Sequence, residues 1–176
     1  NVHLGGYPGP LRKMAGVWVE EIDALAPEQT NEVKFTDGTT ASCNLLCDLI
    51  HLEGAEALAT YEKDFYAGMP AATRNAYGEG AAYYVGTQMD AAGLAKILDR
   101  AVSEVGVKAV IPETTGLEVT CRTSDDTRYY YVMNFKDEDQ ILPESLAGKT
   151  DLISGEVIPA GTVLKKWDVL ILQEAK

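Results

Sequence analysis

The chain has 176 residues and a formal net charge of −12 at pH 7. That length allows one domain or two small ones with a packed core, and 46% hydrophobic and 24% charged residues are typical of a globular protein rather than a disordered one. Both halves are net acidic, which offers phosphate groups no basic surface and argues against nucleic acid as a partner.

The composition also bears on where the protein works. No apolar run approaches the ~18 residues of a membrane-spanning helix, so we expect no membrane partner. Three cysteines, an odd number at low density, fit a reducing compartment, and we expect a cytoplasmic location. The sequence shows no signal peptide and starts at Asn1 without a methionine, so we expect this start to be a cut or a chosen boundary.

The first part of the chain reads as a loop, a short helical turn and a series of strands. Glycines and prolines mark residues 1–10 as a loop, and Gly16 ends a helical turn over 11–15. Residues 41–53 have the apolar content of a helix but follow a hairpin turn at Asp37-Gly38, so strand and helix both stay open there. Strands are expected over 17–22, 32–36, 57–61, 70–76 and 81–86.

Residues 89–105 have the clearest helical pattern. Asp90 is expected to cap the start and Gly106 to follow the end. The order strand, strand, helix predicts an α/β layer. A single apolar stripe is expected on this helix, at Leu94, Ile97, Leu98, Ala101, Val102 and Val105.

The pattern changes after residues 107–116, and we place the domain division there. Residues 117–123 alternate between apolar and polar, and 128–135 are rich in aromatic side chains. Five or six short strands with polar turns indicate an antiparallel β-sandwich or meander. Further short strands are expected at 157–158, 162–165 and 169–172, and the two domains at 1–110 and 111–176.

Several ordered sequence blocks resemble one known family. They lie at 9–12 (Gly-Pro-Leu-Arg), 16–21 (Gly-Val-Trp-Val-Glu-Glu), 46–50 (Leu-Cys-Asp-Leu-Ile), 52–56 (Leu-Glu-Gly-Ala-Glu), 58–61 (Leu-Ala-Thr-Tyr), 64–75 and 77–87. In this order they resemble the middle domain of the family 42 glycoside hydrolases, the bacterial β-galactosidases, over residues 1 to about 110. The remainder is similar, more loosely, to the small C-terminal β domain of that family.

The resemblance implies a fold of class α/β plus all-β. The first part would be the C-terminal part of the middle domain, a partial Rossmann-like, class I amidotransferase-like α/β layer in which 41–53 is a strand. The second part would be a small antiparallel β-sandwich. In the family the middle domain builds a homotrimer, and such a threefold ring closes through heterologous contacts.

The resemblance also implies a function. The catalytic glutamates of the family lie on an N-terminal β/α barrel that this sequence lacks, so no catalytic, cofactor or metal residue carries over. We expect a non-catalytic fragment that serves subunit assembly and supports the absent barrel. The parent would hydrolyse terminal β-D-galactosides with retention.

Two glutamate pairs of this sequence are candidate glycosidase carboxylates, which must converge at about 5 Å for retention or about 6.5–9.5 Å for inversion. Glu20 and Glu21 are adjacent on a strand and face opposite sides. Glu53 and Glu56 converge only if the chain turns at Gly54. Surface charge or a subunit contact is the favoured interpretation of both pairs.

The cysteines and histidines give little support for a metal site. Cys43 and Cys47 share a strand face, but a zinc site needs four ligands and only His3 and His51 are available to complete it. Two small buried thiols are favoured. His51 is expected to be a hydrogen-bonded core or interface residue rather than a base. The cysteines lack elbow glycines, so amidotransferase chemistry is not supported.

The aromatic side chains form two sets that lie mostly in the core. Tyr129 and Tyr131 share a strand face opposite Tyr130, so one face must be exposed or covered by another domain. For exposed aromatics an interface is favoured over sugar stacking. An exposed row of aromatic side chains would favour the alternative function, a carbohydrate-binding module. A concave pocket around Glu20, Glu53 or His51 would instead favour an independent small enzyme. The sets are Tyr61, Phe65, Tyr66, Tyr77, Tyr83 and Tyr84, then Tyr129, Tyr130, Tyr131, Phe135 and Trp167.

Overall fold

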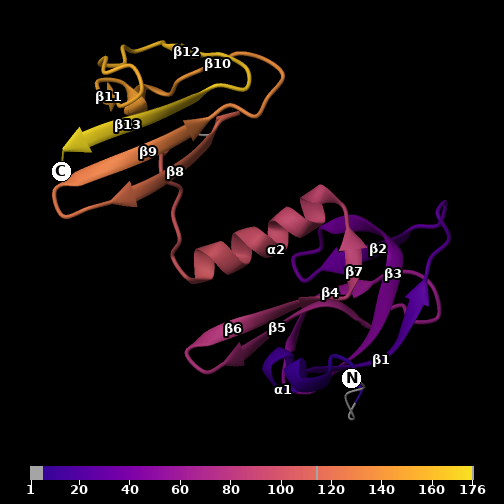
Figure 1. Ribbon diagram of the computed structural model, residues 1–176. Helices are drawn as coiled ribbons and strands as arrows, with labels where there is room; N and C mark the ends of the chain where they lie inside the picture. Colours follow the sequence, from indigo (N-terminus) through magenta and orange to yellow (C-terminus); the bar gives the residue numbers. More distant parts are fainter. Residues whose placement is uncertain (1–5, 114, 176) are drawn as a thin grey trace. The chain divides into compact units, whose positions relative to one another are not determined.

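The chain folds into two compact units in the computed structural model, which describes residues 6–113 and 115–175 (Figure 1). Unit 1 ends at Gly106, and unit 2 begins at Val107. Each unit has its own buried apolar core and is described by itself. Among the described residues, none of the helices has the length and hydropathy of a bilayer-spanning segment.

Unit 1 is built on a seven-stranded sheet. Its elements are η1 (Gly9–Leu11), α1 (Arg12–Ala15), β1 (Val17–Ala24), β2 (Asn31–Phe35), β3 (Thr40–Leu52), β4 (Glu56–Tyr61), β5 (Pro70–Tyr77), β6 (Gly80–Val85), β7 (Thr87–Met89) and α2 (Ala91–Glu104). The strands lie in the order β1-β3-β2-β4-β5-β6, and β7 pairs with β3. All the pairings found in this sheet are antiparallel.

The expected strands of unit 1 are present, and the segment predicted at 41–53 forms the strand β3 over Thr40–Leu52, as the resemblance implied. The partial Rossmann-like α/β layer is not confirmed. Such a layer needs parallel strands joined by crossovers of about a dozen residues or more. Here residues 36–39 join β2 to β3 and residues 78–79 join β5 to β6, which are hairpin lengths. Unit 1 is therefore mostly antiparallel β structure.

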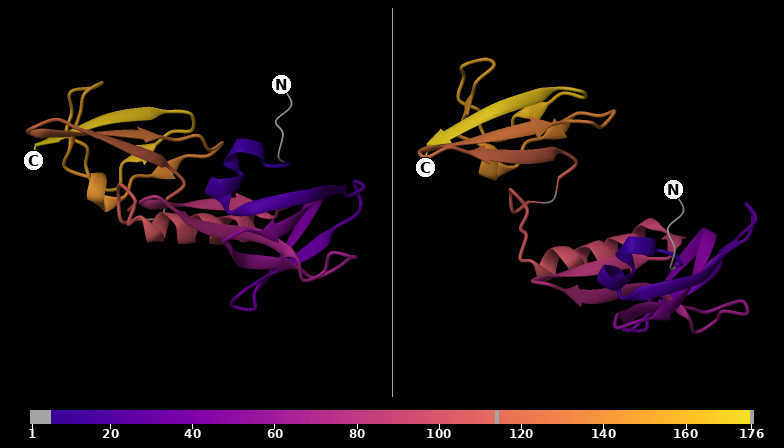
Figure 2. Two further views of the ribbon diagram at one scale, coloured as in Figure 1. Left: turned by 90° about the horizontal axis from the view of Figure 1, so that it is seen from below. Right: turned by 60° about the horizontal axis from the view of Figure 1, so that its bottom comes forward.

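Helix α2 lies along the sheet of unit 1 (Figures 1 and 2). Its predicted cap is confirmed, because Asp90 Oδ1 accepts a hydrogen bond from Gly93 N at 2.8 Å, while Oδ2 accepts one from Ser42 N at 2.9 Å. Met89, predicted to begin the helix, belongs to β7 instead. Asp90 thus fixes both the start of α2 and its position beside β3.

Gly93→Ala is expected to destabilise unit 1 by about 1–3 kcal/mol, although alanine is the better helix former. A Cβ at residue 93 would lie 2.6 Å from the Cβ of Ala41, and both residues are buried. Denaturant unfolding measures the loss. Gly80→Ala is the matched control, because a Cβ there meets nothing within 4 Å and stability should hardly change. Equal effects of the two substitutions would contradict the close packing of α2 on β3.

Unit 2 is an all-β unit in which the pairings found are antiparallel. Its elements are β8 (Glu118–Thr123), β9 (Thr127–Met133), β10 (Gln140–Ile141), η2 (Glu144–Leu146), β11 (Thr150–Asp151), β12 (Val163–Leu164) and β13 (Val169–Ala175). One sheet has the order β11-β13-β9-β8, and a second pairs β10 with β12. This arrangement fits the predicted small sandwich. Residues 157–158, predicted as a strand, provide only the isolated bridge of Val157 to Thr150.

Candidate functional site

The adjacent carboxylates of β1 lie at an irregularity of the sheet. The register of β1 against β3 shifts between Val19 and Ile22, so Glu20 and Glu21 interrupt the regular alternation and both are exposed. Glu20 Oε2 lies 2.6 Å from Nε2 of His51 on β3. Strand geometry predicts that Glu20 and Glu21 face opposite sides of the strand. A bulge disturbs this alternation.

His51 is part of a stack of polar and aromatic side chains on the surface. Its ring packs on that of Trp18 with centroids 4.9 Å apart, and the Arg12 guanidinium carbon lies 5.7 Å from the Trp18 ring centroid. Arg12 Nε donates to Glu53 Oε2 at 2.6 Å. The prediction of a hydrogen-bonded histidine is confirmed, but the side chain is 42% exposed and is not in the core.

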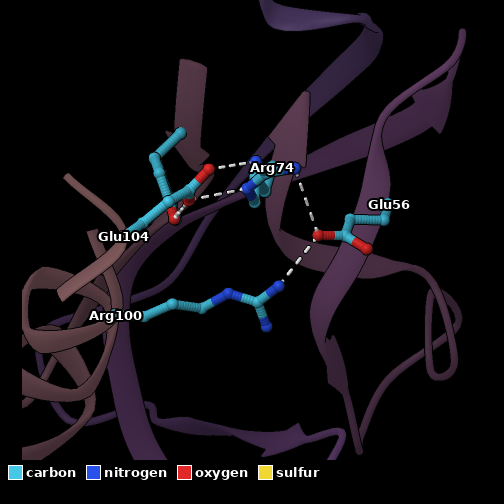
Figure 3. A network of polar contacts seen from close by, with 5 residues as sticks. Glu56, Arg74, Arg100 and Glu104 are labelled. Atoms are coloured by element: carbon cyan, nitrogen blue, oxygen red, sulfur yellow. Dashed lines mark hydrogen bonds and ion pairs between the residues drawn. The ribbon is translucent and has the colours of Figure 1, made fainter. Parts of the chain in front are cut away.

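Glu56 takes part in a different network, which links α2 to the sheet (Figure 3). Arg100 Nη2 donates to Glu56 Oε1 at 2.9 Å, and Arg74 Nη1 lies 3.6 Å from the same oxygen. Arg74 also forms a two-pronged pair with Glu104, which holds the pKa of that carboxyl down at about 2. Glu53 and Glu56 thus bind different arginines, as structural ion pairs do, and this arrangement gives no support to a catalytic pair.

The two cysteines of β3 are buried and share the apolar core of unit 1. Strand β7 lies opposite them and pairs Met89 with Cys43 and Thr87 with Cys47. The two cysteines are four residues apart, whereas their two partners are only two residues apart, so the register shifts between the pairs. The Sγ of Cys47 lies 3.7 Å from the Thr87 hydroxyl. Among the described residues no group of His, Cys, Asp and Glu could hold a metal ion. His3 lies outside the described residues.

Asp48 is a buried carboxylate to which the sequence assigns no role. It lies in β3, and its Oδ2 accepts a hydrogen bond from the Tyr84 hydroxyl at 2.5 Å. Within the described residues, its Oδ1 and the Thr73 hydroxyl have no hydrogen-bond partner. A lone aspartate within the apolar run 45–50 was the signal in the sequence.

Asp48→Asn is expected to stabilise the chain at pH 7. Burial raises the pKa of the Asp48 carboxyl, and the Tyr84 hydroxyl opposes this only in part. Because the folded-state pKa is the higher one, stability falls as the pH rises through it, and the cost is absent below the unfolded-state pKa of about 3.9. The variant should therefore melt at a higher temperature than the parent at pH 7 and at a similar one near pH 3. An equal gain at both pH values would contradict the role of burial.

The aromatic residues divide between core and surface within each unit. In unit 1, Tyr61 and Tyr66 are buried and pack edge to face with centroids 5.0 Å apart, whereas Phe65 and Tyr77 are exposed. In unit 2, Tyr130 is buried. Fewer aromatics lie in the core than the sequence analysis expected.

Two aromatic side chains lie on the outer face of the β11-β13-β9-β8 sheet of unit 2. Tyr129 and Tyr131 are half-buried there, opposite the buried Tyr130, as the alternation predicted. Beyond the end of β9, Phe135 and Trp167 are exposed, and Trp167 N donates to the carbonyl oxygen of the neighbouring Asn134 at 3.0 Å. Val169 and Ile171 of β13 pair with Met133 and Tyr131 and extend the apolar surface across to the next strand.

Comparison with known proteins decides the family. The model of the β-galactosidase trimerisation domain matches residues 1–108, and that of the β-galactosidase C-terminal domain matches residues 116–174. The chain belongs to the family 42 β-galactosidases. It matches the non-catalytic trimerisation and C-terminal domains of that family, which confirms the resemblance seen in the sequence.

Individual relatives agree over nearly the whole chain. β-Galactosidase LacA of Lactobacillus acidophilus is 41% identical over 174 residues, which are 98% of this chain and 26% of LacA. The crystal structure of β-galactosidase from Bacillus circulans sp. alkalophilus superposes with a TM-score of 0.86 at 39% identity, covering 99% of this chain and 27% of that one. The structure of Gan42B, a GH42 β-galactosidase from G. stearothermophilus, gives 0.81 at 30% identity, covering 99% and 26%. This chain thus spans about a quarter of the length of the relatives that it matches.

Proposed function

We propose that this chain assembles subunits and supports the catalytic barrel of a β-galactosidase, without being catalytic itself. The observation that carries the proposal is the pair of family matches, which together span 1–108 and 116–174 and which name a trimerisation domain and a C-terminal domain. The ion-paired state of Glu53 and Glu56 agrees with a structural role. We assign subunit assembly to a domain at residues 1–110, and residues 111–176 to a small β domain.

The parent protein would be a cytoplasmic homotrimer that hydrolyses terminal β-D-galactosides with retention. Retention uses a nucleophile and an acid/base about 5 Å apart. Those two glutamates would lie on the barrel, so the chain needs no catalytic residue of its own. The matched relatives are β-galactosidases by name, which supports the substrate class.

The proposal predicts that residues 1–176 alone do not hydrolyse a chromogenic β-galactoside above the uncatalysed rate. The assay uses purified chain at high concentration, with intact Lactobacillus acidophilus LacA as the positive control. Glu20→Gln and Glu53→Gln serve as matched variants, because each removes one candidate carboxylate from one of the two glutamate pairs. Turnover by the parent chain that either substitution abolishes would overturn the non-catalytic assignment.

A second candidate is a carbohydrate-binding module, favoured by the aromatic outer face of unit 2. Sugar rings stack on exposed aromatic faces, and Tyr129 and Tyr131 lie two residues apart on the same side of β9. Calorimetric titration with galactose, lactose and a galactan oligosaccharide tests it. Heat that saturates with sugar and is lost in Tyr131→Ala supports binding, whereas no heat at millimolar sugar contradicts it.

A further inference from the structure

Helix α2 presents its more apolar side away from its own sheet. Gly93 and Ile97 are buried against the sheet. The other large apolar side chains of the predicted stripe are exposed, by 43% at Leu94, 53% at Leu98, 43% at Val102 and 69% at Val105. The apolar stripe that the sequence predicted is present on α2, but of its large side chains only Ile97 is buried in unit 1.

The geometry of the helix separates two faces. At 3.6 residues per turn, Leu94, Leu98, Val102 and Val105 follow each other at spacings of four and three and share one side. Arg100 and Glu104 lie on the side towards the sheet, where they pair with Glu56 and Arg74 (Figure 3). An amphipathic helix of a globular protein ordinarily buries its apolar side and exposes its charges. Here four large aliphatic side chains of α2 lie exposed on one side, while the partly exposed ion pairs lie on the side of the sheet, which indicates a second packing partner for α2.

The size of this outer face favours a partner from the same polypeptide. A helix of 14 residues is about 21 Å long, so the exposed strip, about 10 Å wide, covers roughly 200 Å². A stable interface between separate molecules buries about 800 Å² on each partner. A tethered segment needs less surface, because the covalent link raises its effective concentration to the millimolar range.

We propose that the outer face of α2, formed by Leu94, Leu98, Val102 and Val105, packs against polypeptide that lies N-terminal to the matched quarter in the relatives. The C-terminal domain model matches up to residue 174, which places most of the relatives' remaining length on the N-terminal side. This inference rests on the proposed function and deepens it. It names the surface through which this chain binds the part of the enzyme that it supports.

Cysteine labelling tests the proposal in two forms of the protein. One form is the 176-residue chain; the other is a chimera in which it replaces the matching quarter of Lactobacillus acidophilus LacA. Both carry Cys121→Ser, since Cys43 and Cys47 are buried and Cys121 is the more accessible thiol of this chain. Leu98→Cys probes the outer face, and Asp99→Cys, exposed on the polar side, is the matched control. The labelling of each form without an introduced cysteine is subtracted.

The expected result is that Leu98→Cys reacts quickly with maleimide in the 176-residue chain and about 10-fold or more slowly in the chimera. Asp99→Cys should react quickly in both, and protection in the chimera should not depend on protein concentration. Equal reactivity of Leu98→Cys in both forms would overturn the proposal. Slow labelling of Leu98→Cys already in the 176-residue chain would also overturn the proposal. In that case an increased mass of the chain in solution would identify a second copy as the occupant, and an unchanged mass would identify unit 2. Trimer formation, measured separately by light scattering, distinguishes failure of this inference from failure of the assembly function.

Discussion

Tyr61→Ala is expected to lower the free energy of unfolding of unit 1 by about 3–5 kcal/mol, as other aromatic-to-alanine changes in cores do. Tyr61 is fully buried in the sheet core and packs edge to face on Tyr66. Its hydroxyl donates to the carbonyl oxygen of Gly86 at 2.9 Å, which links β4 to the residue between β6 and β7. Denaturant unfolding monitored by circular dichroism measures the loss.

Tyr61→Phe is the matched control, because it keeps the ring and removes only the hydroxyl. The Gly86 carbonyl oxygen also accepts from Asp48 N at 2.7 Å, so it keeps a partner in the variant. The cost should be about 1 kcal/mol. If Tyr61→Ala were as mild as Tyr61→Phe, the ring would not be part of a packed core, and the described sheet would be wrong at its centre.

Asn134→Ala is expected to destabilise unit 2 by about 3 kcal/mol or more, since each buried backbone group that loses its partner costs about 1–3 kcal/mol. The Asn134 side chain is buried, and its amide nitrogen lies 2.9 Å, 3.2 Å and 3.1 Å from the carbonyl oxygens of Glu138, Leu164 and Lys165. Its Oδ1 accepts from Lys136 N at 2.9 Å. One side chain thus ties two loops together.

Phe135→Ala is the control for this position, because it changes an exposed neighbour and removes none of those hydrogen bonds. Thermal unfolding of both variants should show a large loss for Asn134→Ala and a small one for Phe135→Ala. Unit 1 should unfold as in the parent, since the two cores share no residue among those described. Similar losses for both variants would contradict the role of the Asn134 amide.

The local elements were predictable from the sequence because their signals are local. Asp37-Gly38 predicted the hairpin turn before 41–53, and Asp90 predicted the start of α2. The ordered sequence blocks predicted the family, and the family matches confirm it. A pattern of two-residue alternation or a capping carboxylate depends on neighbours within about one helical turn, which a single sequence displays directly.

The arrangement of those elements was not predictable in the same way. β3 lies between β1 and β2, a sheet order that depends on long-range pairing rather than on any local signal. The side of α2 that faces the sheet buries Gly93 and Ile97 and carries the Arg74–Glu104 and Arg100–Glu56 pairs, which helical periodicity does not reveal. The partial Rossmann-like layer that the family resemblance implies is not confirmed, because the pairings found among the described strands of unit 1 are antiparallel.

Light scattering coupled to size exclusion, over a range of concentrations, tests the assembly function most directly. The account predicts a species near three times the chain mass of 19.0 kDa, with a fraction that rises with concentration. Variants of the outer face of α2, such as Leu98→Asp, should leave this mass unchanged, because that face binds a different partner. A mass of 19.0 kDa at every concentration would contradict the claim that this chain carries the assembly surface.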